Sequence, residues 1–261
     1  MKLEVVTRES QAEPERAPLL FVHGSCHASW CWEENFLDYF ASRGHSSHAL
    51  SLRGHGQSEG GDKLRWTSVD DYVRDVASVA ERLPSRPVVI GHSLGGLVVQ
   101  KYLEKHAAPA AVLLAPSPSY GMLVGGFHLF LRHPLLFAKM LLTLDVQTLY
   151  GTPALVHKML FSAGLDKAKV ERYAGRFGKE SFRAALDMML CLPRPKRVNS
   201  MLLVLGAAND AIVRPRAIEQ TGRAYSAEFK IFPGMAHDMM LEDGWQDVAA
   251  HIDGWLKAKG L

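Results

Sequence analysis

The chain has few cysteines and no motif that would hold a metal ion or a phosphate group. Its three cysteines among 261 residues, Cys26, Cys31 and Cys191, form no metal-ligand spacing. We read them as free thiols of a reducing compartment rather than as a disulfide framework, with a Cys26–Cys31 bridge as the weaker alternative. The twelve histidines show no H-E-x-x-H spacing, and the glycines form no phosphate-binding loop. The sequence therefore predicts no cofactor and no metal.

Long apolar runs and a strong excess of charge are also missing. No apolar run reaches the ~20 residues that a membrane-spanning helix needs. The opening MKLEVVTRESQAEPER is polar and broken by charges, which is not the pattern of a signal peptide. The net charge of +3 is too small to predict nucleic-acid binding, and 48% hydrophobic residues are typical of a globular enzyme. We expect a cytoplasmic enzyme for a small molecule, without nucleic acid or a membrane span; the oligomeric state is left open.

Short apolar runs alternate with helical patterns along most of the chain. Five runs are typical of strands buried on both faces of a sheet: residues 19–22, 47–52, 87–91, 110–115 and 201–206. Residues 228–232 form a further strand candidate, and the initial LEVV could pair at an edge. Residues 70–83 and the last segment carry apolar side chains at helical spacing. This alternation predicts an α/β fold with a mostly parallel central sheet flanked by helices.

One long segment interrupts the alternation. Residues 117–195 contain no strand candidate and read as helices rich in Leu, Met and Phe. The segment begins with PSPSYG and ends with PRPK, and both stretches break regular structure. It carries ten Lys and Arg against five Asp and Glu, a balance of +5. We predict a helical cap over 117–195, inserted into a core domain formed by 1–116 and 196–261; the alternative is extra helices packed on the core.

The stretch VVIGHSLGGLVVQ, residues 88–100, places one serine between glycines where a strand gives way to a helix. A serine hydroxyl is a poor nucleophile unless a base takes its proton and donors stabilise the oxyanion. A tight turn after a strand lifts the hydroxyl out of the sheet and favours glycine at Gly91 and Gly95. The following helix offers free N–H groups at its start. The pattern therefore predicts Ser93 as a nucleophile.

An acid and a histidine follow in the order that a Ser–acid–His triad on such a sheet uses. Asp210 comes after the strand candidate MLLVLG, and His237 comes after EFKIF. Both would lie at carboxyl ends of parallel strands, the edge where Ser93 lies and where active sites of open α/β sheets form. We predict Ser93, Asp210 and His237 as a catalytic triad.

These segments resemble the α/β-hydrolase fold family over essentially the whole chain. The matching stretches are FVHGSCHASWCW, LRGHGQSEG, GHSLGGLV, GAANDAIVRP and PGMAHDMM. The first and last are similar to the plant methylesterase and hydroxynitrile lyase branch, and bacterial carboxylesterases share the same pieces. The resemblance implies an oxyanion turn at His23-Gly24, with the backbone N–H groups of Ser25 and Leu94 as the donors.

Several positions depart from the family or exclude parts of it. Ser51 stands where the family often has an acid, so no catalytic role is assigned there. The region before Leu19 is short, so one of the family's first two strands could be missing. Ser93 replaces the aspartate of epoxide hydrolases and haloalkane dehalogenases, and Asp238 replaces the lysine that follows the catalytic histidine in hydroxynitrile lyases. Carbon–carbon bond hydrolases usually have a different oxyanion loop.

Other residues near these motifs have weaker assignments. His23 is expected to support the oxyanion turn through hydrogen bonds, and His92 to point into the fold. His27 and Trp30 follow the oxyanion turn and could reach a substrate. From the cap, substrate-lining candidates are Met122, Phe127 and Met188.

Together these features predict a serine hydrolase that cleaves a carboxylic ester through an acyl-enzyme. The Leu, Met and Phe content of the cap favours an apolar acyl or aryl group over a sugar or a charged acid. Its partners would be a small ester and water. Three alternatives remain: hydrolysis of a lactone or amide, hydrolysis of a carbon–carbon bond, and a small-ligand receptor that retains the triad.

Overall fold

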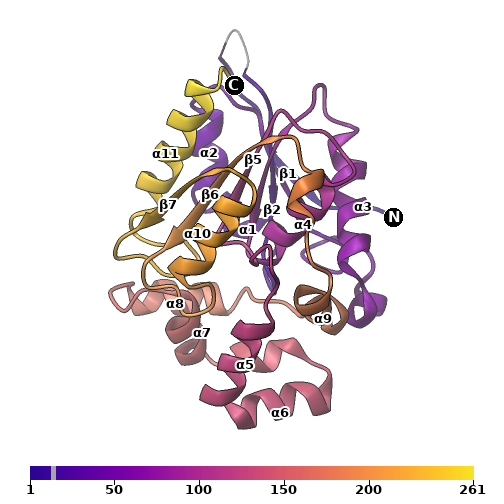
Figure 1. Cartoon of the computed structure of the whole chain (residues 1–261), viewed down its shortest axis with the longest axis vertical. Coiled ribbons are helices and arrows are strands. Elements are labelled where there is room, and N and C mark those ends of the chain that lie inside the picture. Colours follow the sequence, from indigo (N-terminus) through magenta and orange to yellow (C-terminus); the bar gives the residue numbers. More distant parts are fainter. Residues whose placement is uncertain (13–15) are drawn as a thin grey trace.

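A seven-stranded sheet forms the centre of the molecule (Figure 1). The computed structural model describes residues 1–12 and 16–261, without the side chains of residues 124–126, 128 and 129. Within these residues the strand order is β1-β3-β2-β4-β5-β6-β7, with β1 antiparallel to β3 and all other pairs parallel. The strands are β1 (Val5–Arg8), β2 (Leu19–Val22), β3 (Ser47–Leu50), β4 (Val88–His92), β5 (Ala110–Leu114), β6 (Met201–Ala207) and β7 (Glu228–Phe232). The predicted α/β fold is confirmed.

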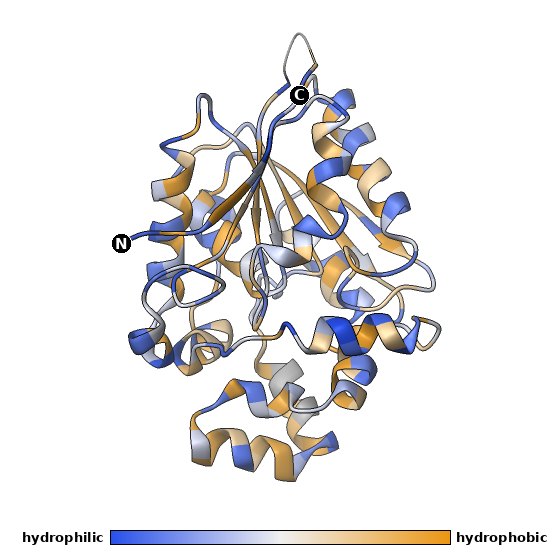
Figure 2. Ribbon diagram, turned by 180° about the vertical axis from the view of Figure 1, so that it is seen from behind, coloured by the Kyte–Doolittle hydropathy of each residue, from blue (hydrophilic) through white to orange (hydrophobic). Residues whose placement is uncertain are grey.

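Helices cover both faces of the sheet, and successive strand residues feed two separate apolar layers. Along β2, Leu19 and Phe21 pack on one face while Leu20 and Val22 pack on the other, as the two-residue period of a strand requires. The first face is covered by α1 (Trp30–Glu33), α2 (Phe36–Ala41) and α11 (Trp245–Ala258). The second is covered by α3 (Val69–Ala80), α4 (Leu94–Leu103) and α10 (Pro215–Ala224). Figure 2 shows the strands as the hydrophobic layer between these helices.

The strands expected from the sequence occur with ends shifted by at most two residues, and LEVV contributes to the edge strand β1. Only β1 precedes β2 in the described residues, so the sheet has seven strands. The sequence analysis did not propose α1, α2, α10 or the helix at Lys167–Ala174. No helix in the described part of the chain has the length and apolar character to cross a membrane.

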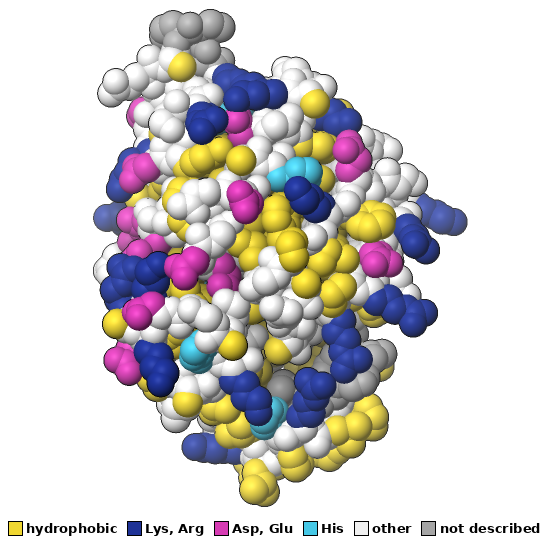
Figure 3. Space-filling view, turned by 90° about the vertical axis from the view of Figure 1, so that its left-hand side faces the viewer, with side chains coloured by type: hydrophobic (Ala, Val, Ile, Leu, Met, Phe, Trp, Pro, Cys, Tyr) yellow, Lys and Arg dark blue, Asp and Glu magenta, His cyan; other side chains and the backbone are white. Residues whose placement is uncertain are grey.

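The segment between β5 and β6 is helical, but its parts pack differently. Its helices are α5 (Leu123–Arg132), α6 (Pro134–Thr143), α7 (Pro153–Leu160), α8 (Lys167–Ala174) and α9 (Phe182–Leu190), with short 3-10 turns η2 (Val146–Tyr150) and η3 (Pro195–Arg197). Residues of α7 and α8 join the core layer beneath α1, whereas α6, η2 and part of α9 form a small cluster of their own. In Figure 1, α5 and α6 lie farthest from the sheet, and in Figure 3 hydrophobic side chains reach the surface at this end. The cap boundaries 117–195 remain a prediction.

Two glycines allow α4 to start directly against the sheet. A Cβ built on Gly95 would lie 2.4 Å from the carbonyl oxygens of Val22 and His23, and one on Gly91 would lie 2.4 Å from the carbonyl oxygen of Gly95. These are backbone atoms in tightly paired elements, so they have no room to move aside. Glycine at both positions is therefore a packing requirement.

We expect Gly95→Ala to destabilise the protein by ~1–3 kcal/mol, because the added methyl forces α4 away from β2. Gly254→Ala is the matched control: no atom lies within 4 Å of its added Cβ, and it stands inside α11, where alanine is the better helix former by about 0.5–1 kcal/mol. Thermal unfolding should show a lower Tm for the first variant and an unchanged or higher Tm for the second. Equal Tm values for Gly95→Ala and the wild type would contradict the packing argument.

Candidate active site

Ser93 lies on the sharp turn between β4 and α4. Its backbone φ is +52°, a left-handed value that is strained for a serine. The turn is held by the Ser93 N–H, which donates to the Leu114 carbonyl at 3.1 Å. The Ser93 Oγ lies 2.9 Å from Nε2 of His237. The strand–turn–helix arrangement thus presents the hydroxyl to a base.

His237 and Asp210 come from the loops that follow β7 and β6. The Nδ1 of His237 lies 2.7 Å from Oδ2 of Asp210, and the other carboxylate oxygen accepts from the N–H groups of Ile212 and Val213. A carboxylate accepts hydrogen bonds, so Nδ1 carries the proton and the free lone pair of Nε2 faces the serine. The structure brings Ser93, His237 and Asp210 into one hydrogen-bonded chain.

The electrostatics favour a basic His237. Burial alone lowers the pKa of His237, but the charge and hydrogen bond of Asp210 outweigh it and raise this pKa above its ordinary value of 6.5. The side chain is 2% exposed, so solvent screens this interaction weakly. The imidazolium that forms when His237 takes a proton is therefore stabilised where it stands.

The backbone N–H groups of Ser25 and Leu94 are free of protein acceptors within the described part of the chain. Leu94 is the first residue of α4, where N–H groups have no partner in the helix. Ser25 lies in the turn that Gly24 brings against Ser93: a Cβ on Gly24 would stand 3.0 Å from the Ser93 Cβ. Two unpaired donors thus lie beside Ser93.

A buried ion pair supports the Ser25 turn from below. Nδ1 of His27 lies 2.8 Å from the Ser25 carbonyl, and Nε2 lies 3.1 Å from Oδ2 of Asp238. Both neighbours are hydrogen-bond acceptors, so both ring nitrogens of His27 are placed to donate to them. Burial raises the pKa of Asp238, but His27 and His92 outweigh it and keep this pKa below its usual range.

A second buried pair holds the other side of the same peptide group. The Cys26 N–H donates to Oε2 of Glu180 at 3.1 Å, and Nε2 of His55 lies 3.3 Å from that oxygen. Nδ1 of His55 faces the Arg53 carbonyl at 3.1 Å, so the ring is held on its other side while Nε2 pairs with Glu180. Burial lowers the pKa of His55, and the Glu180 charge outweighs it and raises this pKa. The peptide between Ser25 and Cys26 is therefore fixed at both its C=O and its N–H.

Two further histidines are structural and neutral. Nε2 of His92 lies 3.1 Å from the His237 carbonyl, and burial together with the nearby His237 lowers the pKa of His92 to about 3. His23 accepts from the Leu52 N–H and faces the Gly24 carbonyl with Nδ1, and burial lowers its pKa well below 6.5. Both histidines thus hold backbone groups around the site.

One group of side chains in the described residues has the spacing of metal ligands. Ligand atoms of His92, His237 and Asp238 lie within 4.8 Å of one another. Most of these atoms are engaged, because Nε2 of His92 faces a carbonyl, both nitrogens of His237 belong to the chain with Ser93, and Oδ2 of Asp238 pairs with His27. Within the described part of the chain, Oδ1 of Asp238 has no hydrogen-bond partner and lies 3.6 Å from Nε2 of His92.

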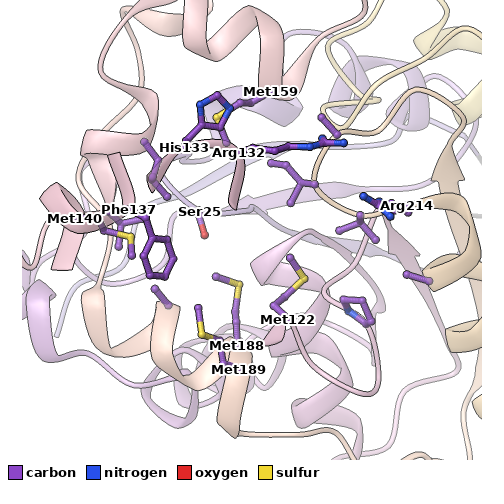
Figure 4. A pocket seen from close by; sticks show the side chains of 18 of the residues that line it. Ser25, Met122, Arg132, His133, Phe137, Met140, Met159, Met188, Met189 and Arg214 are labelled. Carbon is purple, nitrogen blue, oxygen red and sulfur yellow. The ribbon is translucent and has the colours of Figure 1, made fainter. Parts of the chain in front are cut away.

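A cavity of about 450 Å³ opens above the site (Figure 4). Ser25 forms part of its wall, while Ser93 and His237 lie just outside it. In Figure 4, Met122, Met188 and Met189 lie on one side of the cavity, with Arg132, His133 and Met159 across from them. Among the described residues, none of those that form the wall is an aspartate or glutamate; the larger side chains of the wall are Tyr120, Met122, Phe137, Met140, Leu149, Tyr150, Met159, Met188, Met189, Ile212, Arg132, His133, Lys158 and Arg214.

The predicted lining residues fall in different places. Met122 and Met188 belong to the cavity wall. Phe127 is 59% exposed and lies outside it, against Phe130 on the outer side of α5. His27 and Trp30 are also outside the wall, because both are buried and stack on each other beneath α8, where His27 pairs with Asp238.

The sequence analysis missed the support of the Ser25 turn. In the sequence, Asp238 was interpreted only as a replacement for the lysine of hydroxynitrile lyases. An acid next to the predicted catalytic histidine in an apolar stretch was nevertheless a usable signal. Glu180 and His55 gave no such signal, since Glu180 lies 154 residues from Cys26 in sequence. The basic residues of the cavity wall were seen only as part of the cap's net charge.

Comparison with known proteins agrees with this architecture. A pyrethroid hydrolase of Sphingobium wenxiniae is 28% identical over 96 residues, covering 37% of this chain and 34% of that protein. Methyl jasmonate esterase 1 of Vitis vinifera is 27% identical over 118 residues, covering 42% of this chain and 44% of that protein. The matches thus span well under half the length of these relatives.

Among solved structures, the monoacylglycerol lipase of Paleococcus ferrophilus superposes with a TM-score of 0.75 at 22% identity, covering 99% of this chain and 100% of that one. At this identity the likeness shows the fold. The model of the alpha/beta hydrolase family matches residues 19–251, nearly the whole sheet with its helices and all three residues of the hydrogen-bonded chain. The chain therefore belongs to the alpha/beta hydrolase family.

Proposed function

We propose that the protein is a serine esterase that cleaves carboxylic esters with an apolar acyl or aryl group through an acyl-enzyme. The observation that carries this proposal is the chain from Ser93 Oγ to His237 Nε2 at 2.9 Å and from His237 Nδ1 to Asp210 at 2.7 Å. The esterase and hydrolase relatives support ester hydrolysis in general. The ester preference and the residue roles are our inference.

In the acylation step, His237 takes the proton of the Ser93 hydroxyl while Oγ attacks the acyl carbon. The carbonyl oxygen becomes an oxyanion, for which the free N–H groups of Ser25 and Leu94 are the donors. Asp210 keeps the proton on Nδ1 and stabilises the imidazolium. His237 then protonates the leaving alcohol as the carbon–oxygen bond breaks.

In the deacylation step, water replaces the alcohol. His237 takes a proton from the water, whose oxygen attacks the acyl carbon, and a second oxyanion forms at the same two donors. Its collapse releases the acid and returns the proton to Ser93. The His27–Asp238 and His55–Glu180 pairs keep the Ser25 turn in place through both steps, so no reorganisation is needed when the charge develops.

The cavity supports an apolar acyl or aryl group. Its wall is mostly methionine, leucine, phenylalanine and other apolar side chains, and the flexible methionines adapt to ligand shape. Lactones and amides pass through the same tetrahedral intermediates and remain within reach of this site. Rapid turnover of simple aryl esters separates an esterase from a receptor that retains the triad.

We expect a fluorophosphonate probe to label one serine, and Ser93→Ala to abolish both labelling and turnover while the protein stays folded. The matched control is Ser117→Ala, since the Ser117 N–H donates to the Ser93 carbonyl and its hydroxyl is buried nearby. Peptide mass spectrometry of the labelled enzyme locates the adduct. An adduct on Ser25 or Ser117 would refute the assignment of the nucleophile.

The value of kcat/KM should rise with pH through a pKa above 6.5, because His237 acts as a base only when neutral and Asp210 raises its pKa. Asp210→Asn should cut kcat on the order of 10⁴-fold. It should also move the inflection of the remaining activity to lower pH, because burial then acts on the pKa of His237 without the opposing charge.

The matched control for this variant is Asp247→Asn, an exposed aspartate of α11. It should leave both the rate and the pH profile unchanged. The assignment of the acid would be wrong if Asp210→Asn stayed near wild-type activity while Asp238→Asn lost it.

Each methylene added to the acyl chain should raise kcat/KM about three- to fourfold until the cavity is full, since burying one CH₂ contributes roughly 0.8 kcal/mol. Met188→Ala enlarges the wall and should move the optimum to longer chains. Met201→Ala, an exposed methionine at the start of β6, is the control and should not move it. A series of p-nitrophenyl esters measures this, and a flat profile unaffected by Met188→Ala would rule out acyl binding in the cavity.

A further inference from the structure

The outer helices α5 and α6 expose an unusual amount of apolar surface. Of the large hydrophobic side chains that are strongly exposed in the described residues, half lie between residues 123 and 142. Leu135 is 85% exposed and Leu142 is 86% exposed, so these side chains have almost no protein contact. We call this surface the apolar tip; its residues are Leu123, Phe127, Phe130, Leu131, Leu135, Leu141 and Leu142.

The exposure is patterned rather than scattered. On α5, Leu123, Phe127, Phe130 and Leu131 follow the i, i+4, i+7, i+8 spacing of a single helix face. On α6, the side opposite the exposed leucines is already packed: Leu136, Phe137 and Met140 belong to the small cluster with η2 and α9. The outward leucines of α6 are therefore additional apolar surface. A contiguous apolar patch of this kind on a folded protein marks an interaction site.

The charges on the two helices of the apolar tip have one sign, and the first acid after them, Asp145, is half-buried and accepts from the Gln147 N–H. Residues 117–144 contain no aspartate or glutamate. Arg132 and Lys139 are exposed on the same two helices, and Lys158 and Arg214 stand at the nearby cavity wall. Figure 3 shows Lys and Arg side chains just above the hydrophobic end of the molecule. A partner must therefore offer an apolar interior and a negative surface.

We propose that the apolar tip docks the protein onto an anionic lipid bilayer. Leucine and phenylalanine side chains would enter the acyl region while Arg132 and Lys139 remain at the level of the anionic headgroups, as in helices that lie in a membrane interface. Basic residues gain from such a surface only within about a Debye length, ~8–10 Å, and both are within the two docking helices.

The charge pattern favours a bilayer over a second copy of this chain. In a twofold dimer through the tip the same patch meets itself, so Arg132 and Lys139 of each copy would approach the equivalent cations of the other. With no acidic residue in 117–144, no side chain of α5 or α6 would neutralise them. An anionic lipid surface satisfies both the apolar and the cationic side chains.

Docking would place the cavity at the lipid surface. Arg132, Phe137 and Met140 line the cavity and belong to the same two helices as the apolar tip, and His133 lines it from the residue that joins them. An ester dissolved in the bilayer could then enter the cavity without crossing water. This second part rests on the proposed esterase function, whereas the docking itself does not depend on catalysis.

The docking is tested by flotation of the full-length protein with vesicles of phosphatidylcholine alone and with added phosphatidylglycerol. We expect the wild type to float with the anionic vesicles and salt to weaken this binding. The double variant Leu135→Ser/Leu142→Ser and the single variant Lys139→Glu should each bind at least tenfold less. The controls are Met201→Ser and Lys230→Glu, which change an exposed apolar and an exposed basic residue on β6 and β7.

Activity separates the two parts of the proposal. All four variants lie outside the cavity wall and the triad, so hydrolysis of a soluble short-chain p-nitrophenyl ester should be unchanged, while hydrolysis of a vesicle-borne ester should fall for the tip variants alone. Absence of any soluble-ester hydrolysis would refute the proposed function. The flotation result would still test the docking, because it does not depend on catalysis. The docking proposal would be overturned if the wild type did not float or if all variants floated equally. It would also be overturned if the protein formed a dimer that Leu135→Ser/Leu142→Ser dissociates and did not bind lipid.

Discussion

The close approach between the start of α4 and the end of β2 sets the geometry of the whole reactive edge. Gly95 rests against the carbonyl oxygens of Val22 and His23, and Gly24 lies against Ser93 in return. No side chain fits between these two turns, so the hydroxyl on one and the free N–H on the other face each other at a fixed separation. The hydrogen-bonded chain through His237 is useful only because this contact leaves so little freedom.

Two buried ion pairs also fix the conformation of the turn at Ser25. The peptide between Ser25 and Cys26 is held at its carbonyl by His27 and at its N–H by Glu180, and each has a charged partner, Asp238 and His55. Removing one member of a buried pair leaves an uncompensated charge, which typically costs ~3–5 kcal/mol, so neither pair opens readily. The Ser25 turn, which contains the strained residue Cys26 with φ of +63°, is thereby kept in one conformation.

Sequence patterns predicted the features that depend on neighbouring residues. The strands, the turn around Ser93 and the loops with Asp210 and His237 each carry a local signal, and strand order then brings them to one edge. Contacts between distant segments had none: Glu180 reaches Cys26 only after the inserted helices fold back. His27 looked like a residue near substrate because its place in sequence is next to the oxyanion turn, yet its ring points toward Asp238.

The division of the inserted helices has an evolutionary consequence. Residues of α7 and α8 share the core layer with α1 and α11, so changes there disturb the sheet. In contrast, α6 rests on a small cluster with η2 and α9, and α5 contacts α6 and α9. Substitutions, insertions or exchange of α5 and α6 would therefore leave the hydrogen-bonded chain through His237 and the buried ion pairs intact. Selection can reshape the entrance of such an enzyme quickly while its chemistry stays constant, and homologous chains should differ most in length and composition over this helix pair.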